Sequence, residues 1–133
     1  MAQINAILNF CVVAVVVVTA VVWVGTPGPP KPLPNDAHFV AQIQQPGTVL
    51  VKFGADWCPP CRGIEQELDA LVHADPDHVT VVKINIDQNR ALAQHYQVTS
   101  IPHLVLFHNG KQVDTAKGYR TREQLKAWIA TTH

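Results

Sequence analysis

The chain has 133 residues, ten basic and ten acidic side chains, and a formal net charge of zero. This length suits one domain with one core, and the balanced charge argues against a nucleic-acid-binding protein, which would carry a basic excess. Three cysteines cannot build a framework of several disulfides, so the fold must depend on its hydrophobic core.

The N-terminal segment, residues 1–25, is predicted to be a single transmembrane anchor. Between positions 6 and 24 the only polar residues are Asn9, Cys11 and Thr19, and about 20 apolar residues in a helix span a bilayer. We interpret Cys11 as a small apolar residue of this helix. The alternative is a cleaved signal peptide, but no Lys or Arg precedes the run and it continues past Ala20.

Residues 26–34 are predicted to be an extended linker. Five prolines occur between positions 25 and 34, and neither a helix interior nor the centre of a sheet accommodates them. Such a segment forms a semi-rigid spacer of roughly 3 Å per residue. A folded domain is expected to follow over residues 35–133.

The first half of this domain alternates between helix and strand patterns. Asn35-Asp36 is expected to cap a short helix that runs to about Gln44, and Pro46 and Gly47 then turn the chain. The next elements are a strand over 48–53, a helix from the cysteines to about residue 73, and a strand over 79–86. Two apolar strands joined by a helix predict a parallel, right-handed βαβ unit.

The second half ends in a hairpin and a helix. After a short helix over 90–96 we expect a strand over 103–107 and a partner strand over 111–115, joined by Asn109 and Gly110, a strong hairpin signal. Gly118 ends the partner strand, and Thr121 with Gln124 forms a capping-box pattern for the last helix. The fold class is therefore α/β, a mixed four-stranded sheet flanked by helices.

Two cysteines, Cys58 and Cys61, lie between the first predicted strand and the helix that follows it. A C-x-x-C pair in this position indicates either redox or metal chemistry. A zinc site would add His73 and His78, at a spacing close to that of a zinc finger. Pro76 separates these histidines, whereas a finger carries both on one helix. We therefore expect no metal at this site.

The redox interpretation explains more of the pattern. Cysteines three apart in a first helical turn can form a disulfide. Cys58, at the helix N-terminus, is favoured as a thiolate by the helix dipole and is predicted to be the nucleophile. Cys61, one turn inside, is the predicted resolving thiol that attacks the mixed disulfide. Pro59 suits the first helical position, where its missing N–H costs nothing.

From Asn35 to its C-terminus, about three-quarters of its length, the chain resembles a thioredoxin. The residues that carry the resemblance are Trp57-Cys58-Pro59-Pro60-Cys61, Lys83-Ile84-Asn85-Ile86-Asp87, Ser100-Ile101-Pro102, Phe107-His108-Asn109-Gly110-Lys111 and Gly118. The resemblance implies a cis peptide bond before Pro102, lying against the active-site sulfurs. It also implies that the backbone of Ile101, with Pro102 and Gly118, binds an extended substrate peptide, and that Trp57 belongs to the active site.

Several positions depart from the family pattern. Lys52 stands where the family has a buried acid; we interpret it as a lysine whose stem packs in the sheet while its ammonium reaches water. Two functional alternatives are a neutral lysine that accepts a proton and a charged one that stabilises a thiolate. Gly54 replaces an aromatic residue and is expected to open space near Trp57. His103, after Pro102, is interpreted as a partly exposed bystander; the alternative is a residue that tunes the thiolate.

The pair Pro59 and Pro60 is expected to tune the redox couple. Two prolines remove two N–H donors from the turn, which leaves the Cys58 thiolate less stabilised and the protein more reducing. The predicted function is a membrane-tethered thiol–disulfide oxidoreductase, mostly a protein-disulfide reductase, that needs no cofactor beyond the Cys58/Cys61 disulfide. A redox-inactive peptide-binding module and a zinc-binding domain are the alternatives.

The expected partners are disulfide-containing protein substrates and an upstream dithiol electron donor, and the protein is expected to be a monomer. A tether makes sense on the oxidising side of a membrane, so the domain is expected to be extracytoplasmic. The one basic residue that flanks the apolar run, Lys31, slightly favours the cytoplasmic face instead. Secretion after cleavage of the N-terminal segment is the third alternative.

Overall fold

The structure is a computed structural model that describes residues 36–132. The predicted anchor over 1–25 and the predicted linker over 26–34 lie outside the described residues. Among the described helices, none has the length and apolar character needed to cross a membrane.

The described part of the chain is built on a four-stranded mixed sheet, as predicted. Its strands are β1 (Thr48–Gly54), β2 (Val79–Asn85), β3 (His103–His108) and β4 (Lys111–Lys117), in the spatial order β2-β1-β3-β4. β1 pairs with β2 in parallel, while β1 with β3 and β3 with β4 are antiparallel. β1 is therefore a central strand, and the site that follows it is held by neighbours on both sides.

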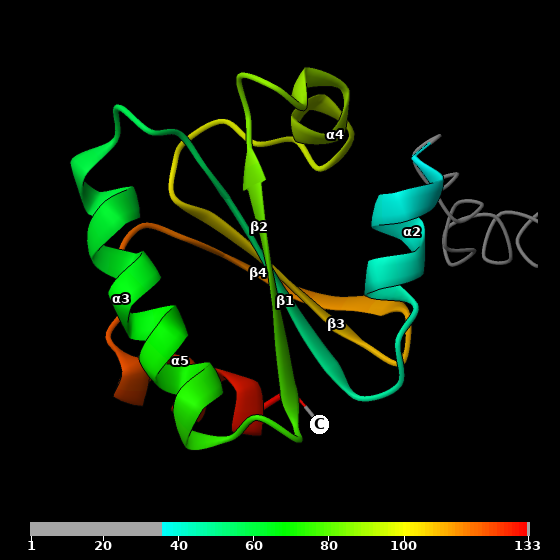
Figure 1. The fold of residues 1–133 in the computed structure, drawn as a ribbon, viewed down its shortest axis with the longest axis vertical. Helices are drawn as coiled ribbons and strands as arrows, with labels where there is room; N and C mark the ends of the chain where they lie inside the picture. The colour runs from blue at the N-terminus through cyan, green and yellow to red at the C-terminus, as the bar shows by residue number, and fades with distance from the viewer. Residues whose placement is uncertain (1–35, 133) are drawn as a thin grey trace, which may run out of the picture. The chain divides into compact units, whose positions relative to one another are not determined.

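Four helices cover the two faces of this sheet. They are α2 (Ala37–Ile43), α3 (Pro59–Ala74), α4 (Arg90–His95) and α5 (Arg122–Ala130). Figure 1 shows α3 and α5 on one face and α2 and α4 on the other. The parallel connection from β1 through α3 to β2 is the predicted βαβ unit.

Alternating side chains of β1 and β3 supply a separate core to each face. Leu50 and Leu106 belong to the cluster that packs with α3 and α5, whereas Val51 and Phe107 belong to the cluster that packs with α2 and α4. This period of two is what an extended strand imposes, and all seven residues of β1 are buried. The position of Lys52, next after Val51, therefore directs its side chain to the α3 side.

Local signals in the sequence form as predicted. The Asp36 carboxylate accepts a hydrogen bond from the Phe39 backbone N–H at 3.0 Å and caps α2. Asn109 and Gly110 both take positive φ, 49° and 80°, which a two-residue hairpin turn requires. Thr121 and Gln124 make both hydrogen bonds of the capping box at the start of α5.

Candidate active site

Cys58 and Cys61 lie at the junction between β1 and α3. β1 ends at Gly54, a short loop follows, and Cys58 is the residue that caps α3. The two cysteines form a disulfide across a Cα–Cα distance of 5.3 Å. They are 4% and 1% exposed and pack with Ala55, so the couple is recessed below the surface of the helix end.

The start of α3 offers few hydrogen-bond donors to Cys58. Pro59 and Pro60 occupy its first two positions and have no backbone N–H. The next N–H, of Cys61, donates to the carbonyl oxygen of Cys58 at 3.1 Å. The donors that usually favour an anion at a helix N-terminus are therefore missing or already engaged in the first turn.

Trp57 stands on the surface beside the disulfide. Its side chain is 66% exposed, an unusual state for so large an apolar group. Its indole Nε1–H donates to the Asp87 carboxylate at 3.0 Å, and Asp87 follows the end of β2. The hydrogen bond holds the ring over the loop and leaves an apolar surface next to Cys58.

The loop before β3 closes the site from the other side. The Ile101–Pro102 peptide bond is cis, and Ile101 packs against the cluster that contains both cysteines. The Gly118 N–H donates to the Pro102 carbonyl oxygen at 2.8 Å. Gly118 has φ +83° and no atom within 4 Å of the position of a Cβ. A side chain there would meet no neighbouring atoms, but its backbone would be held in a left-handed conformation that favours glycine. The structure thus brings Ile101, Pro102 and Gly118 together.

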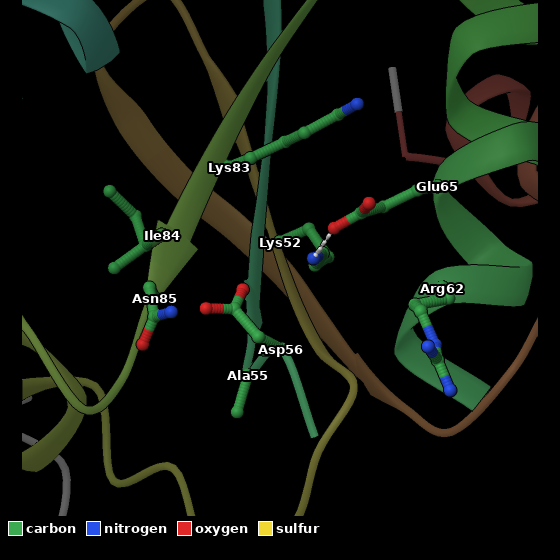
Figure 2. A pocket seen from close by; sticks show the side chains of 9 residues that line it. Lys52, Ala55, Asp56, Arg62, Glu65, Lys83, Ile84 and Asn85 are labelled. Carbon is green, nitrogen blue, oxygen red and sulfur yellow. Dashed lines mark hydrogen bonds and ion pairs between the residues drawn. The ribbon is translucent and has the colours of Figure 1, made fainter. Parts of the chain in front are cut away.

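Lys52 does not reach water, and that part of the sequence interpretation is wrong. Its side chain is 5% exposed, and its ammonium forms an ion pair with the Glu65 carboxylate on α3. Figure 2 shows the two side chains pointing at each other between the sheet and the helix. Because β1 is central and its alternation directs Lys52 under α3, the helix covers the lysine side chain.

Gly54 makes room for Lys52 rather than for Trp57. A Cβ built on Gly54 would lie 2.9 Å from Lys52 Nζ and 3.3 Å from the Cβ of Cys61. The prediction that Gly54 opens space near Trp57 is therefore wrong. The atoms nearest to a side chain at this position would belong to Lys52 and Cys61. A glycine at this position leaves space that both the Lys52 ammonium and the Cys61 side chain border.

His103 is buried, which contradicts its interpretation as partly exposed. The residue is 3% exposed and neither ring nitrogen has a hydrogen-bond partner among the described residues. Its ring packs edge-on against Phe53 at 6.2 Å between centroids. Burial lowers the pKa of the His103 imidazole, with a further contribution from the positive charge of Lys117.

The residues of the zinc alternative do not converge. Cys58 caps the first turn of α3 and His73 lies in its last turn, so the two are roughly 20 Å apart at 1.5 Å per residue. His78, beyond the helix, contacts the Asp75 carboxylate at 2.5 Å. Within residues 36–132, no three His, Cys, Asp or Glu side chains gather as they would around a metal ion.

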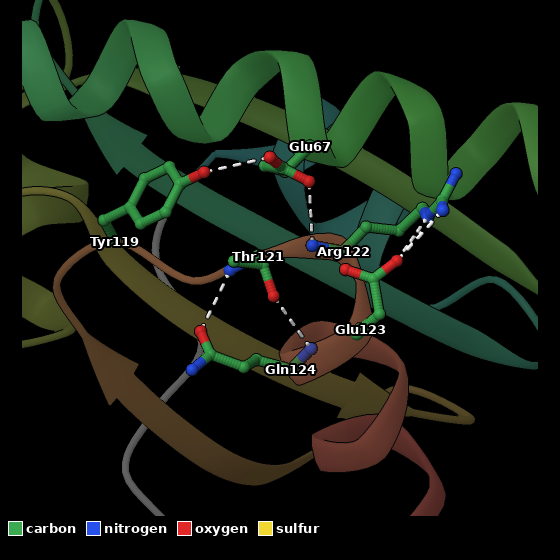
Figure 3. Close-up of polar contacts among 6 residues, drawn as sticks. All are labelled: Glu67, Tyr119, Thr121, Arg122, Glu123 and Gln124. Atoms are coloured by element: carbon green, nitrogen blue, oxygen red, sulfur yellow. Dashed lines mark hydrogen bonds and ion pairs between the residues drawn. The ribbon is translucent and has the colours of Figure 1, made fainter.

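Two functional candidates were missed from the sequence, both of them glutamates on α3. Glu65 is the partner of Lys52, and its position four residues after Cys61 was the available signal. Glu67 accepts a hydrogen bond from the Tyr119 hydroxyl at 2.9 Å and one from the Arg122 backbone N–H at 2.8 Å (Figure 3). Glu67 thereby ties the segment after Gly118 to α3, close to the disulfide.

Comparison of the chain with known proteins finds thioredoxins, both among family models and among individual sequences. The family model described as Thioredoxin matches residues 32–131. The chain is 42% identical over 96 residues to a thioredoxin of Alicyclobacillus acidocaldarius, covering 72% of this chain and 91% of that protein. It is 47% identical over 79 residues to a thioredoxin of Griffithsia pacifica, covering 59% of this chain and 71% of that protein.

A solved structure shows the same fold. It concerns the thiol resolving mechanism of yeast mitochondrial 1-Cys peroxiredoxin through the glutathione and thioredoxin systems. One of its chains matches this one with a TM-score of 0.66 and 29% identity, covering 74% of this chain and 92% of that chain.

Proposed function

The chain belongs to the thioredoxin family and is a thiol–disulfide oxidoreductase, and from this premise we propose that it is a membrane-tethered protein-disulfide reductase. The observation that carries the reducing direction is the start of α3, where Pro59 and Pro60 replace two N–H donors. A less stabilised thiolate makes the reduced form less stable, and a couple of that kind donates its electrons more readily.

The proposed reaction has two steps. The Cys58 thiolate attacks a sulfur of the substrate disulfide, forms a mixed disulfide and releases the first substrate thiolate. The Cys61 thiolate then attacks the Cys58 sulfur, forms the Cys58–Cys61 disulfide and releases the second substrate thiolate. Two electrons pass to the substrate and each released thiolate takes one proton. An upstream dithiol donor is needed to reduce the Cys58–Cys61 disulfide again.

The substrate segment is proposed to bind beside the disulfide as an extended chain. Ile101 packs on the cysteine cluster, and its backbone makes no hydrogen bond to another backbone group within residues 36–132. A peptide can therefore pair with that backbone as it would with a strand edge. The exposed Trp57 ring and the open space at Gly118 are proposed to add contacts that tolerate many peptide sequences.

We also propose that the domain faces the extracytoplasmic side of a membrane and acts as a monomer. The support is the apolar run before position 25 and the proline-rich segment after it. A tether and a spacer serve a reductase that delivers electrons to particular proteins at a membrane on its oxidising side, where disulfides form.

Reduction of insulin disulfides by the full chain tests the proposed activity. We expect turnover with a dithiol donor, and none with Cys58→Ser. A folded wild-type chain that fails to reduce insulin but still binds extended peptides would favour the redox-inactive binding module. Stoichiometric zinc in the reduced, purified chain would favour the zinc alternative.

A further inference from the structure

Two lysines lie side by side on the sheet and each meets a carboxylate of α3. Lys52 and Lys83 are partners in the register of β1 and β2, an arrangement in which like charges repel. Lys52 pairs with Glu65, and the Lys83 ammonium lies 2.7 Å from the Asp69 carboxylate. On α3 the residues Cys61, Glu65 and Asp69 recur at intervals of four, so they share one helix face.

The two pairs differ in burial and in their distance along the helix from Cys61. Lys83 and Asp69 have side chains that are 41% and 68% exposed, so water screens their charges. The Lys52 side chain is almost completely buried, and a single methyl group on Gly54 would touch both its Nζ and Cys61. Only the Lys52–Glu65 pair is therefore placed to act on the resolving cysteine.

A pocket of about 320 Å³ opens on this pair between β1, β2 and the first turns of α3 (Figure 2). Its charged lining residues are Lys52, Asp56, Arg62, Glu65 and Lys83. Glu65 is partly exposed, so it connects the buried ammonium with the outside. A proton released near Cys61 has a polar route to solvent here, whereas the other surroundings of Cys61 are apolar.

We propose that Lys52 and Glu65 are positioning residues that set the ionisation of Cys61 in the resolving step. This inference rests on the proposed thiol–disulfide exchange and deepens it. Glu65 holds the Lys52 ammonium beside Cys61, and that charge favours the thiolate. The Cys61 thiol loses its proton through the pocket to solvent; its sulfur then attacks Cys58, the Cys58–Cys61 bond forms, and the bond from Cys58 to the substrate sulfur breaks.

The two members of the pair have opposite expected effects. Lys52→Met removes the positive charge and leaves the Glu65 carboxylate, so the pKa of Cys61 should rise. Glu65→Gln removes the negative charge and leaves the Lys52 ammonium, so the pKa of Cys61 should fall. A purely structural pair would instead give losses of the same sign in both variants.

Single-turnover reduction of dithiobis(nitrobenzoate) by the reduced full chain separates the two steps. All proteins carry Cys11→Ser, so that only Cys58 and Cys61 react, and the aromatic disulfide is kept below one equivalent. The first nitrothiolate reports the attack by Cys58, and the second reports the attack by Cys61. Each phase is followed from pH 6 to pH 10.

For Lys52→Met we expect a second phase about tenfold slower at pH 7, equivalent to one unit in the pKa of Cys61, with the wild-type rate restored at high pH. The first phase should change less than twofold. For Glu65→Gln the pH midpoint of the second phase should fall below that of the wild type. Lys111→Met, which replaces an exposed lysine at the start of β4, is the control and should leave both phases unchanged.

Equal midpoints in Lys52→Met and the wild type would overturn the inference, as would a Glu65→Gln midpoint at or above that of the wild type. Cooperative thermal unfolding of each variant verifies that it is folded. If Lys52→Met does not fold, the pH midpoint of Glu65→Gln tests the inference by itself. Failure of the proposed function would give a different result, because the wild type itself would release no second nitrothiolate at any pH.

Discussion

At the scale of single residues, the two cysteines of the disulfide lie in different surroundings, and we propose a different role for each. Cys58 caps α3 beside the exposed Trp57, whereas Cys61 lies one turn inside the helix against Lys52 and Gly54. These positions support the proposed assignment of attack to Cys58 and resolution to Cys61.

Cys61→Ser should therefore trap substrates as mixed disulfides on Cys58. The mixed disulfide has no internal thiol to resolve it, so its lifetime should rise by at least about a hundredfold, limited by exchange with external thiols. Non-reducing electrophoresis of cell extracts measures the adducts. Cys58→Ser is the control, and adducts of similar abundance on that variant would contradict the assignment.

His103 should make the protein less stable as the pH falls. The pKa of the folded-state imidazole is lowered by burial, so the unfolded state binds the proton more tightly. Stability is complete above the unfolded pKa of about 6.5 and declines as the pH falls from there toward the folded value.

His103→Val removes this titration. Between pH 7.5 and pH 5.5 the wild type should lose more free energy of unfolding than the variant does, because its unfolded state takes up a proton that the buried imidazole resists. Urea unfolding at the two pH values measures it. The same loss in both proteins would show that other groups carry the pH dependence.

These residues also show where reasoning from the sequence stops. The cysteines, the cis-proline loop and Gly118 were predicted because short motifs carry them. The burial of Lys52 and His103 depends on strand order and on partners 13 residues or more away, namely Glu65 and the ring of Phe53. Residue type alone favours exposure for lysine and only intermediate burial for histidine, so tertiary packing decides the burial of both.

At the scale of elements, we propose that the start of α3 tunes the redox couple. Pro60→Ala returns one N–H to the second helical position, where it can stabilise the Cys58 thiolate. We expect the reduction potential to become less negative by about 20–40 mV, equivalent to roughly 1–2 kcal/mol. Equilibration with a dithiol buffer measures the shift, and an unchanged or more negative potential would contradict the role of the prolines.

Glu67 joins α3 to the segment between β4 and α5. Glu67→Ala removes the acceptor of the Tyr119 hydroxyl and of the Arg122 N–H, and we expect a loss of about 1 kcal/mol in the free energy of unfolding, since the carboxylate is partly exposed. Glu123→Ala, which removes an exposed pair with Arg122, is the matched control and should change stability little. Equal effects in urea unfolding would refute this anchoring role.

Most helices and strands could be predicted because capping and turn residues mark their ends in the sequence. The caps of α2 and α5 and the turn at Asn109 and Gly110 are within a residue of their predicted places. β4 continues two residues past the predicted end at 115, because its pairing with β3 runs on to Lys117 opposite His103. That extension is set by a partner strand, which the local pattern does not contain.

At the scale of the whole molecule, the proposal joins a redox domain to a membrane. In cells that express the full chain with Cys11→Ser, we expect a membrane-impermeant alkylating reagent to label the reduced Cys58 without lysis. The chain should also stay with the membrane fraction after an alkaline wash. Labelling only after lysis would place the domain on the cytoplasmic face, and release by the wash would contradict the anchor.

The central claim is that the Cys58/Cys61 couple is a reductant, and its equilibrium reduction potential tests this most directly. The full chain, with Cys11→Ser, is equilibrated in dithiol–disulfide buffers and its two remaining thiols are counted by alkylation. We predict a potential near or below that of thioredoxin, about −270 mV. A value near that of the strong oxidants, about −120 mV, would contradict the account and make the protein an oxidase of thiols instead.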